Sequence, residues 1–199
     1  MILSFDIGIK NLSYCIMYKS NLNRNKNDIK IIDWGIIQLI DDDIKCKTVP
    51  LGTITEILYN KLHDKFIDYD IDTILLENQP VLKNPLMKSI QMIIYGYFNY
   101  EKHIMGRNIE SIKLINASNK LKLGKKLKDF NNSVDVQEIN KINSKYTKNK
   151  KLAIIYTNHF LKQRLIEEDY EKYNTIFNDH KKKDDLSDAF LQGLYFIEH

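Results

Sequence analysis

The chain has 199 residues, of which 43% are hydrophobic and 28% charged, and its formal net charge is +4. This length predicts one domain (residues 1–199) with a buried core and is too short for an enzyme of two lobes, and the composition excludes wholesale disorder. The two cysteines, Cys15 and Cys46, match no zinc-site spacing and predict no disulfide framework, as is typical of a reducing compartment.

Strand and helix patterns alternate along the chain in an order that predicts an α/β protein. Three runs rich in β-forming residues come first, and a polar loop at residues 21–28 separates the second from the third. An amphipathic helix, a continuous apolar strand, an apolar helix that can begin at Pro85, and a fifth strand follow. The expected elements are strands 2–7, 12–18 and 31–40, helix 53–66, strand Thr73–Glu77, helix 86–105, strand 109–115, and helices 152–165 and 184–197.

The helix at residues 86–105 is apolar on almost every side, for example at Ile90, Met92, Ile93 and Phe98. A helix of this kind needs cover on every side. It is therefore either enclosed in the core or packed against a second subunit, and of the two we favour the subunit interface of a homodimer.

Positive charge is concentrated between Lys113 and Lys151, where eleven lysines face three acidic residues. One interpretation is a surface that binds the phosphates of a nucleic acid, and the other is a solvated lysine loop. The polar stretch 116–148 has little periodicity and predicts a mobile loop or an excursion of the chain. The N-terminus has no signal-peptide pattern, and the apolar stretch 90–100 is about half a membrane span, so we expect a soluble intracellular protein.

Acidic residues stand at three places where the surrounding sequence predicts burial. Asp6 lies in the first apolar strand, Glu77 ends the central strand, and Asp185 and Asp188 lie three residues apart on one face of the last helix. Burying such carboxylates without a partner costs several kcal/mol or neutralises them, and bound Mg²⁺ removes that cost. Each acid alone has an ordinary explanation as a turn, cap or salt-bridge residue, and Asp184 reads as a helix-end residue. Their joint order predicts a metal site.

The segments that carry these acids resemble the poxvirus-type Holliday junction resolvases, which are RuvC-like members of the RNase H-like superfamily. The resemblance rests on FDIGIKNLSYCI, on ILLENQP with PLMKSIQMIIYGYF, and on KKDDLSDAFLQGLYF, which together span both ends and the middle of the chain. It implies an RNase H-like fold with a five-stranded mixed sheet flanked by helices. The long lysine-rich stretch before the last helices departs from the family pattern.

The resemblance also implies a set of functional residues and partners. Asp6, Glu77, Asp185 and Asp188 correspond to the catalytic acids that bind two Mg²⁺ ions, which Mn²⁺ can replace. Lys120 corresponds to a catalytic lysine, with Lys122 as the alternative. The implied activity is an endonuclease of DNA recombination and repair that cuts four-way junctions by paired symmetric nicks, as a homodimer, in a viral protein of the host cytoplasm.

Other functions remain open on the same fold. One is a nuclease for RNA:DNA hybrids, which shares the chemistry, and another is a nucleic-acid-binding module without catalysis. A phosphotransferase of the actin and sugar-kinase type also opens with an Asp-x-Gly strand, but it needs two lobes and a second glycine-rich loop, and this chain has only seven glycines.

Overall fold

A mixed five-stranded sheet forms the centre of the molecule. The computed structural model describes residues 1–20 and 29–199, so the loop predicted at 21–28 lies outside the described residues. The strand order is β3-β2-β1-β4-β5, with β1 antiparallel to β2, β2 antiparallel to β3, and parallel pairs β1–β4 and β4–β5. The strands are β1 (Ile2–Asp6), β2 (Asn11–Lys19), β3 (Ile29–Gln38), β4 (Thr73–Glu77) and β5 (Ser111–Ile115).

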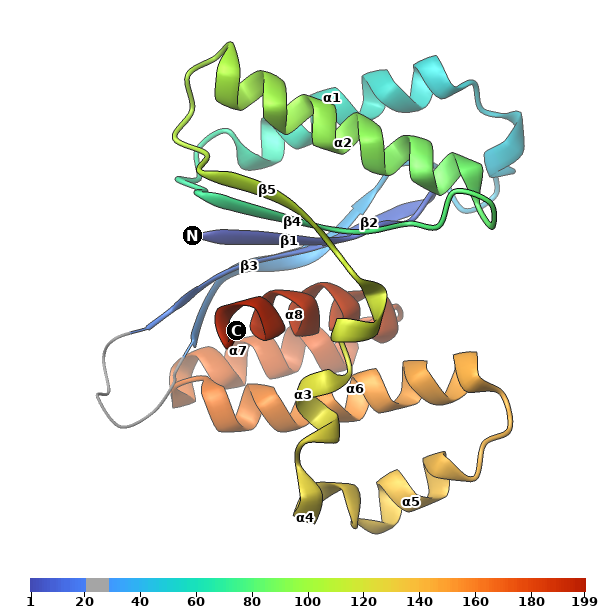
Figure 1. Cartoon of the computed structure of the whole chain (residues 1–199), viewed down its shortest axis with the longest axis vertical. Helices are drawn as coiled ribbons and strands as arrows, with labels where there is room; N and C mark the ends of the chain where they lie inside the picture. Colours follow the sequence, from blue (N-terminus) through green and yellow to red (C-terminus); the bar gives the residue numbers. More distant parts are fainter. Residues whose placement is uncertain (21–28) are drawn as a thin grey trace.

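Helices cover both faces of this sheet (Figure 1). On one face lie α1 (Leu51–Phe66) and α2 (Pro85–His103), which contact each other, and α2 also contacts β4 and β5. On the other face α8 (Lys183–Ile197) crosses β1, β2 and β3, and α6 (Lys145–Arg164) and α7 (Glu167–Asp179) pack against α8. The predicted α/β fold with a flanked, five-stranded mixed sheet is confirmed.

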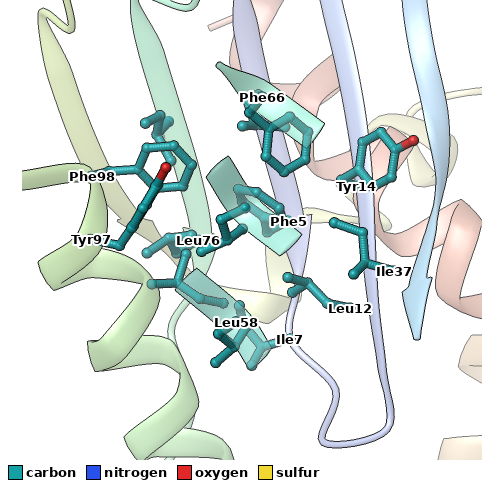
Figure 2. Close-up of a cluster of buried hydrophobic side chains, with 14 of the residues drawn as sticks. Phe5, Ile7, Leu12, Tyr14, Ile37, Leu58, Phe66, Leu76, Tyr97 and Phe98 are labelled. Carbon is teal, nitrogen blue, oxygen red and sulfur yellow. The ribbon is translucent and has the colours of Figure 1, made fainter. Parts of the chain in front are cut away.

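The two faces hold two hydrophobic cores because side chains alternate along each strand. Leu3 and Phe5 of β1 face α1, where the ring of Phe5 meets Phe66 edge-on with centroids 5.5 Å apart (Figure 2). Ser4 faces α8 instead, where it accepts a hydrogen bond from Gln192. By the same alternation Asp6 emerges on the α8 side of the sheet.

The prediction of a mobile loop at residues 116–148 is wrong. This stretch forms a short 3₁₀ turn and short helices before α6 begins. Elsewhere in the chain, another 3₁₀ turn, η1 (Cys46–Thr48), precedes α1. Helices of four to seven residues are too short to show a helical period in a sequence window. Leu121, Leu123 and Val136 are buried in the core beneath α6 and α8. The elements are η2 (Ala117–Asn119), α3 (Lys122–Lys125), α4 (Lys128–Asn131) and α5 (Val134–Asn140).

The helix α7 lies where the sequence analysis assigns no element. It is polar over most of its surface, but Tyr173 and Phe177 are buried against Trp34, whose ring stacks on Phe177 with centroids 5.3 Å apart. The buried face of α7 thus consists of two aromatic residues one turn apart. The other predicted elements are present, with ends that differ by a few residues, except that the helix predicted at 152–165 begins seven residues earlier, at Lys145.

The apolar helix α2 is covered on one side only within the described residues. Ile90, Ile94 and Phe98 are buried against the sheet and α1. Met92 and Tyr100 keep 45% and 50% of their surface exposed. The helix is therefore not enclosed in the core, and the predicted subunit interface stays a prediction. No helix among residues 1–20 and 29–199 has the length and apolar character needed to cross a membrane.

Candidate active site

Asp6 and Glu77 lie side by side because two parallel strands end together. In the register of β1 and β4, Phe5 pairs with Leu76, so the next residue of each strand is an acid. Phe5 and Leu76 both point to the core under α1, and the two acids therefore point to the opposite face, toward α8. The turn after β1 needs Gly8, since a Cβ there would lie 2.1 Å from the carbonyl oxygen of Asn11.

The loop after β4 is held in place by α2 and β5. The backbone N–H of Asn78 donates to the carbonyl of Ile115 at 2.8 Å, and that of Gln79 donates to the side chain of Gln91 at 2.8 Å. Gln91 is fully buried in α2. These bonds fix the backbone directly after Glu77 and hence the direction of its carboxylate.

The helix α8 brings Asp185 and Asp188 to the same place. Three side chains bind it to the sheet: the indole N–H of Trp34 donates to the carbonyl of Leu186 at 3.1 Å, and the hydroxyl of Ser13 donates to the carbonyl of Asp185 at 2.7 Å. One turn after Asp188, the buried amide of Gln192 donates to Ser4 and to the carbonyl of Phe5, each at 3.1 Å. The helix is thus anchored on both sides of its acidic edge.

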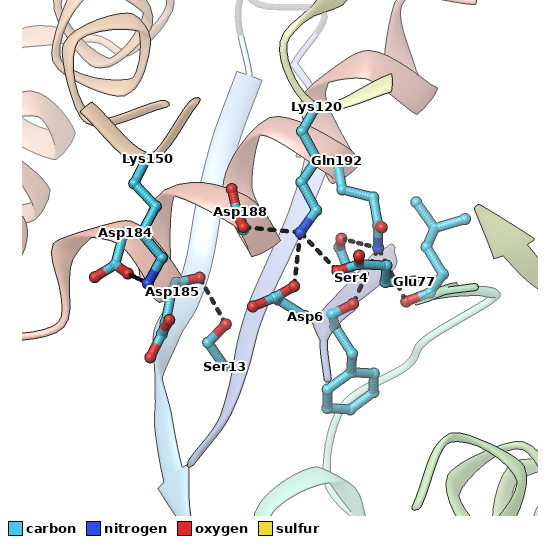
Figure 3. Close-up of polar contacts among 12 residues, drawn as sticks. Ser4, Asp6, Ser13, Glu77, Lys120, Lys150, Asp184, Asp185, Asp188 and Gln192 are labelled. Carbon is cyan, nitrogen blue, oxygen red and sulfur yellow. Dashed lines mark hydrogen bonds and ion pairs between the residues drawn. The ribbon is translucent and has the colours of Figure 1, made fainter. Parts of the chain in front are cut away.

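The ammonium group of Lys120 joins the acids. Its Nζ lies 2.6 Å from Oδ1 of Asp6, 2.6 Å from Oε2 of Glu77 and 2.9 Å from Oδ2 of Asp188 (Figure 3). The lysine side chain is 7% exposed, and it comes from the short turn that follows β5, the strand beside β4. Three carboxylates from β1, β4 and α8 therefore converge on one cation.

Burial changes the acidity of this cluster. It raises the pKa of Asp6 to about 7, with Glu77 adding to the rise and Lys120 opposing it. Burial likewise raises the pKa of Asp188 to about 6 against the effect of Lys120. For Asp185 burial, Asp184 and Asp6 together raise the pKa to about 6. Burial lowers the pKa of Lys120, but the three carboxylates outweigh it, so this pKa lies well above its usual value.

Each residue that the sequence singled out now has a position. Asp6, Glu77 and Asp188 surround Lys120, and Asp185 lines the same hollow of about 310 Å³ without contacting the lysine. Lys122 is exposed and lies over the ring of Tyr195, so it is not part of the cluster. Asp184 forms an ion pair with Lys150 of α6.

Several residues of this hollow carry no signal in the sequence. Lys10 lies in the turn after β1 and Asn11 begins β2, whereas Tyr146 and Lys150 come from the first turns of α6. Tyr146 is 70% exposed at the rim, with the ammonium of Lys150 4.9 Å from its ring centroid. A run of lysines and one tyrosine in a polar stretch do not predict such a place, because only packing of α6 against α8 creates it.

The residues fit a divalent metal by their chemistry. Carboxylate oxygens are the ligands that Mg²⁺ prefers, and the three that converge here already bind a cation. Their distances to the ammonium exceed the Mg–O distance of about 2.0–2.1 Å, and the described residues contain no group of three or more acidic, histidine or cysteine side chains preformed around a metal position. The carboxylates would have to close inward to bind Mg²⁺.

Comparison with known proteins finds relatives in sequence and in structure. No protein-family model matches the chain. It is 34% identical over 197 residues to the uncharacterized protein L451 of Acanthamoeba polyphaga mimivirus; the match covers 93% of this chain, which spans only 42% of that protein.

Three solved structures are similar over nearly the whole chain. The yeast mitochondrial Holliday junction resolvase Ydc2 has a TM-score of 0.64 and 17% identity, over 98% of this chain and 78% of that one. The fowlpox virus resolvase, solved with Holliday junction DNA, has a TM-score of 0.57 and 25% identity over 100% and 99%. T. thermophilus RuvC in complex with its Holliday junction substrate has a TM-score of 0.56 and 7% identity over 98% and 90%. The resemblance found in the sequence is thus confirmed, and the chain has the RuvC-like variant of the RNase H-like fold that the poxvirus-type resolvases share.

Proposed function

We propose that the chain is a metal-dependent DNA endonuclease that resolves four-way junctions. One observation carries the proposal: carboxylates from β1, β4 and α8 converge on a single cation at 2.6–2.9 Å, in a fold whose solved representatives include resolvases bound to Holliday junctions. Buried acids are a poor means of stabilising a fold, because hydrophobic residues of similar volume often stabilise it as well or better. Their convergence therefore supports a functional role.

In this proposal the acids hold the metal and shape the reaction. Asp6, Glu77 and Asp188 would hold two Mg²⁺ ions, and Asp185 would be either a further ligand or a residue that orients the attacking water. When bound, two such ions would supply the charge that activates a water and stabilises the leaving 3′-oxygen of a phosphodiester. Mn²⁺ would replace Mg²⁺, because both accept oxygen ligands.

Lys120 has two roles in the proposed reaction. It would compete with Mg²⁺ for the same three carboxylates, which keep one positive charge among them until metal binds. Once released, its ammonium can reach the scissile phosphate or the nucleophile, where a positive charge stabilises the developing negative charge. We therefore propose Lys120, and not Lys122, as the catalytic lysine.

A homodimer would place two such sites on one junction. Each site then cuts one strand, and paired symmetric nicks leave ends that a ligase can join. We propose that the exposed side of α2, with Met92 and Tyr100, contributes to the subunit interface. The lysines between Lys113 and Lys151 would contact the DNA backbone without reading bases, which makes binding dependent on salt.

The test is cleavage of an immobile four-way DNA junction in the presence of Mg²⁺. We expect paired nicks from the wild-type chain and none from Glu77→Gln, which loses a ligand charge but keeps the side-chain size. The matched control is Glu110→Gln, which should cut normally. Glu110 is exposed and precedes β5, at the end of the sheet opposite to Glu77. A fully active Glu77→Gln protein contradicts the proposed site.

The same assay separates the alternative functions. An RNA:DNA hybrid offered beside the junction should be cut far more slowly, and preferential cleavage of the hybrid would change the proposed substrate. Binding of the junction with no metal-dependent cleavage would instead identify a non-catalytic binding module.

A further inference from the structure

A second hollow lies beside the catalytic one, and Asn149 of α6 lines both this hollow and the space next to the acidic cluster. It has a volume of about 480 Å³ and is enclosed by α3, the α5–α6 connection and the first turns of α6. Its polar lining is rich in lysine and asparagine, and the lining side chains that the structure describes include no acid. The lining includes Lys125, Asn131, Asn143, Lys145, Lys148 and Asn149. We propose that this lysine hollow binds backbone phosphates of the DNA strand that continues from the catalytic site.

The sequence of α6 is electrostatically unfavourable without an anion. Its first seven residues, KYTKNKK, contain four lysines, and its first turn has no acid. The N-terminal end of a helix carries partial positive charge that acts within the first turn, so Lys145 and Lys148 each cost about 0.3–1 kcal/mol there. By contrast, α7 and α8 begin with acids, as helices usually do. An anion bound near the start of α6 would offset this repulsion.

Ion pairs within the described residues do not offset the repulsion between most of these lysines and the positive end of α6. Lys150 pairs with Asp184, but Lys145 and Lys148 have no acidic partner within the described residues. The ammonium of Lys148 makes a long contact of 3.4 Å to the carbonyl oxygen of Asn140. Two ammonium groups of α6 are therefore available to a ligand at the mouth of the lysine hollow.

The floor of the hollow is fixed by buried contacts. Tyr156 is 2% exposed, and its hydroxyl donates to Oδ1 of Asn131 at 2.8 Å. The amide of Asn131 donates in turn to the carbonyl of Gly124 at 2.9 Å. Gly124 lies flat on the tyrosine ring, where a Cβ would come within 2.2 Å. The lysines thus surround a rigid floor whose own polar groups are satisfied.

The position of the hollow indicates a continuous strand of DNA as its ligand. Asn149 lines both the lysine hollow and the space beside Glu77, Lys120 and Asp188. The positive charge is spread over α3 and α6 rather than gathered around one point, which suits a chain of phosphates better than a single small anion. This inference rests on the proposed function.

The test compares the salt dependence of junction binding in EDTA, where no strand is cut. For the double variant Lys145→Ala/Lys148→Ala we expect the slope of log affinity against log salt to fall by about two, close to one for each lost phosphate contact. Adding Lys125→Ala should lower it by about one more. Lys145→Arg/Lys148→Arg should keep the wild-type slope, because it keeps both charges in the same helix.

The charge-matched control is Lys61→Ala/Lys162→Ala, at exposed lysines of α1 and of the far end of α6. It should leave the slope unchanged. An equal fall in both double variants, or no fall in either, overturns the inference. A titration with inorganic phosphate gives a further outcome that would overturn the inference. If phosphate raises the melting temperature of the wild type but not of the Lys145→Ala/Lys148→Ala variant, and this variant binds the junction normally, the ligand is a small anion.

Failure of this inference can be told from failure of the proposed function. If the wild-type chain cuts the junction with Mg²⁺ and the Lys145/Lys148 variant binds with the wild-type slope, only the lysine hollow is excluded. If the wild-type chain neither binds nor cuts the junction, both proposals fail.

Discussion

At the scale of single residues, Lys120 determines the state of the acidic cluster. Its ammonium group contacts Asp6, Glu77 and Asp188, and all four side chains are mostly withdrawn from water. Removing one partner of such a group leaves buried charge uncompensated. The lysine and a divalent metal should therefore replace each other as the counter-charge of the three carboxylates.

Lys120→Met tests this exchange. In EDTA we expect the free energy of unfolding to fall by roughly 3 kcal/mol, because the carboxylates lose their cation. Mg²⁺ should then stabilise the variant more than the wild-type chain, since no ammonium competes with it. Urea unfolding with and without Mg²⁺ measures both effects. Lys122→Met, at the exposed neighbour, should change neither, and an equal Mg²⁺ response in Lys120→Met and wild type would argue against competition.

The raised pKa values of the acids predict how the metal-free protein responds to pH. Asp6 has a pKa of about 7 and Asp188 of about 6, both raised from 3.8 by burial. Between about pH 4 and 7 the folded state therefore holds protons that the unfolded chain has released. Since stability falls with rising pH wherever the folded state binds more protons, these groups make the metal-free protein less stable toward neutral pH.

Asp6→Asn isolates this effect. The difference in unfolding free energy between the variant and wild type should change across pH 5–7 in EDTA, with the variant gaining relative stability as the pH rises. In the wild type, cleavage at limiting Mg²⁺ should increase over the same range, because metal binds the ionised carboxylates. A difference between the two proteins that is flat from pH 5 to 8 would show that Asp6 is already ionised.

At the scale of secondary-structure elements, the contact of α8 with the sheet positions the site. Gly193 allows the close approach, since a Cβ there would lie 3.0 Å from the end of Met17 and 3.3 Å from the Cβ of Ser4. Gly193 is one turn and a residue beyond Asp188. A larger side chain would push the helix away from β1 and separate Asp188 from Asp6.

Gly193→Val should therefore lower the free energy of unfolding by about 1–3 kcal/mol, the usual cost of overpacking. Junction cleavage should fall as well, because the acids no longer converge. Gly52→Val is the matched control in α1, where a Cβ meets nothing within 4 Å, and it should change stability by no more than about 0.5 kcal/mol. Equal stability of the two variants in chemical denaturation would refute the close approach of α8.

At the scale of the whole molecule, the exposed side of α2 concerns assembly. Met92, Gly96 and Tyr100 follow one another at four-residue spacing, so they share one face of the helix, and all three are exposed. A stable dimer covers about 800 Å² on each partner. An exposed helix face with apolar side chains can contribute to such an area. The predicted homodimer would bury it.

Met92→Glu should convert the dimer to a monomer, because a charge in an apolar interface stays unpaired. Light scattering at micromolar protein gives the mass directly. Met105→Glu, an exposed methionine just beyond the end of α2, is the control and should leave the dimer intact. A wild-type chain that is monomeric at this concentration would remove the dimer from the proposal.

Local sequence patterns were sufficient to predict most of the sheet and to select the four acidic residues. Alternation and continuous apolar runs predict the five strands, since they depend only on neighbouring residues. Asp6 and Glu77 could be chosen because each interrupts or ends such a run. Asp185 and Asp188 could be chosen because three residues bring them to one helix face.

Only the tertiary structure decided which side chains meet. Lys120 and Lys122 are equivalent in sequence, but the turn after β5 directs Lys120 into the carboxylates and leaves Lys122 exposed. The short helices of 117–140, and α7 with its two buried aromatics, are stabilised by contacts with distant segments. Tyr146 and Lys150 reach the site through the packing of α6 on α8. Such contacts join residues far apart in the chain, and no local pattern contains them.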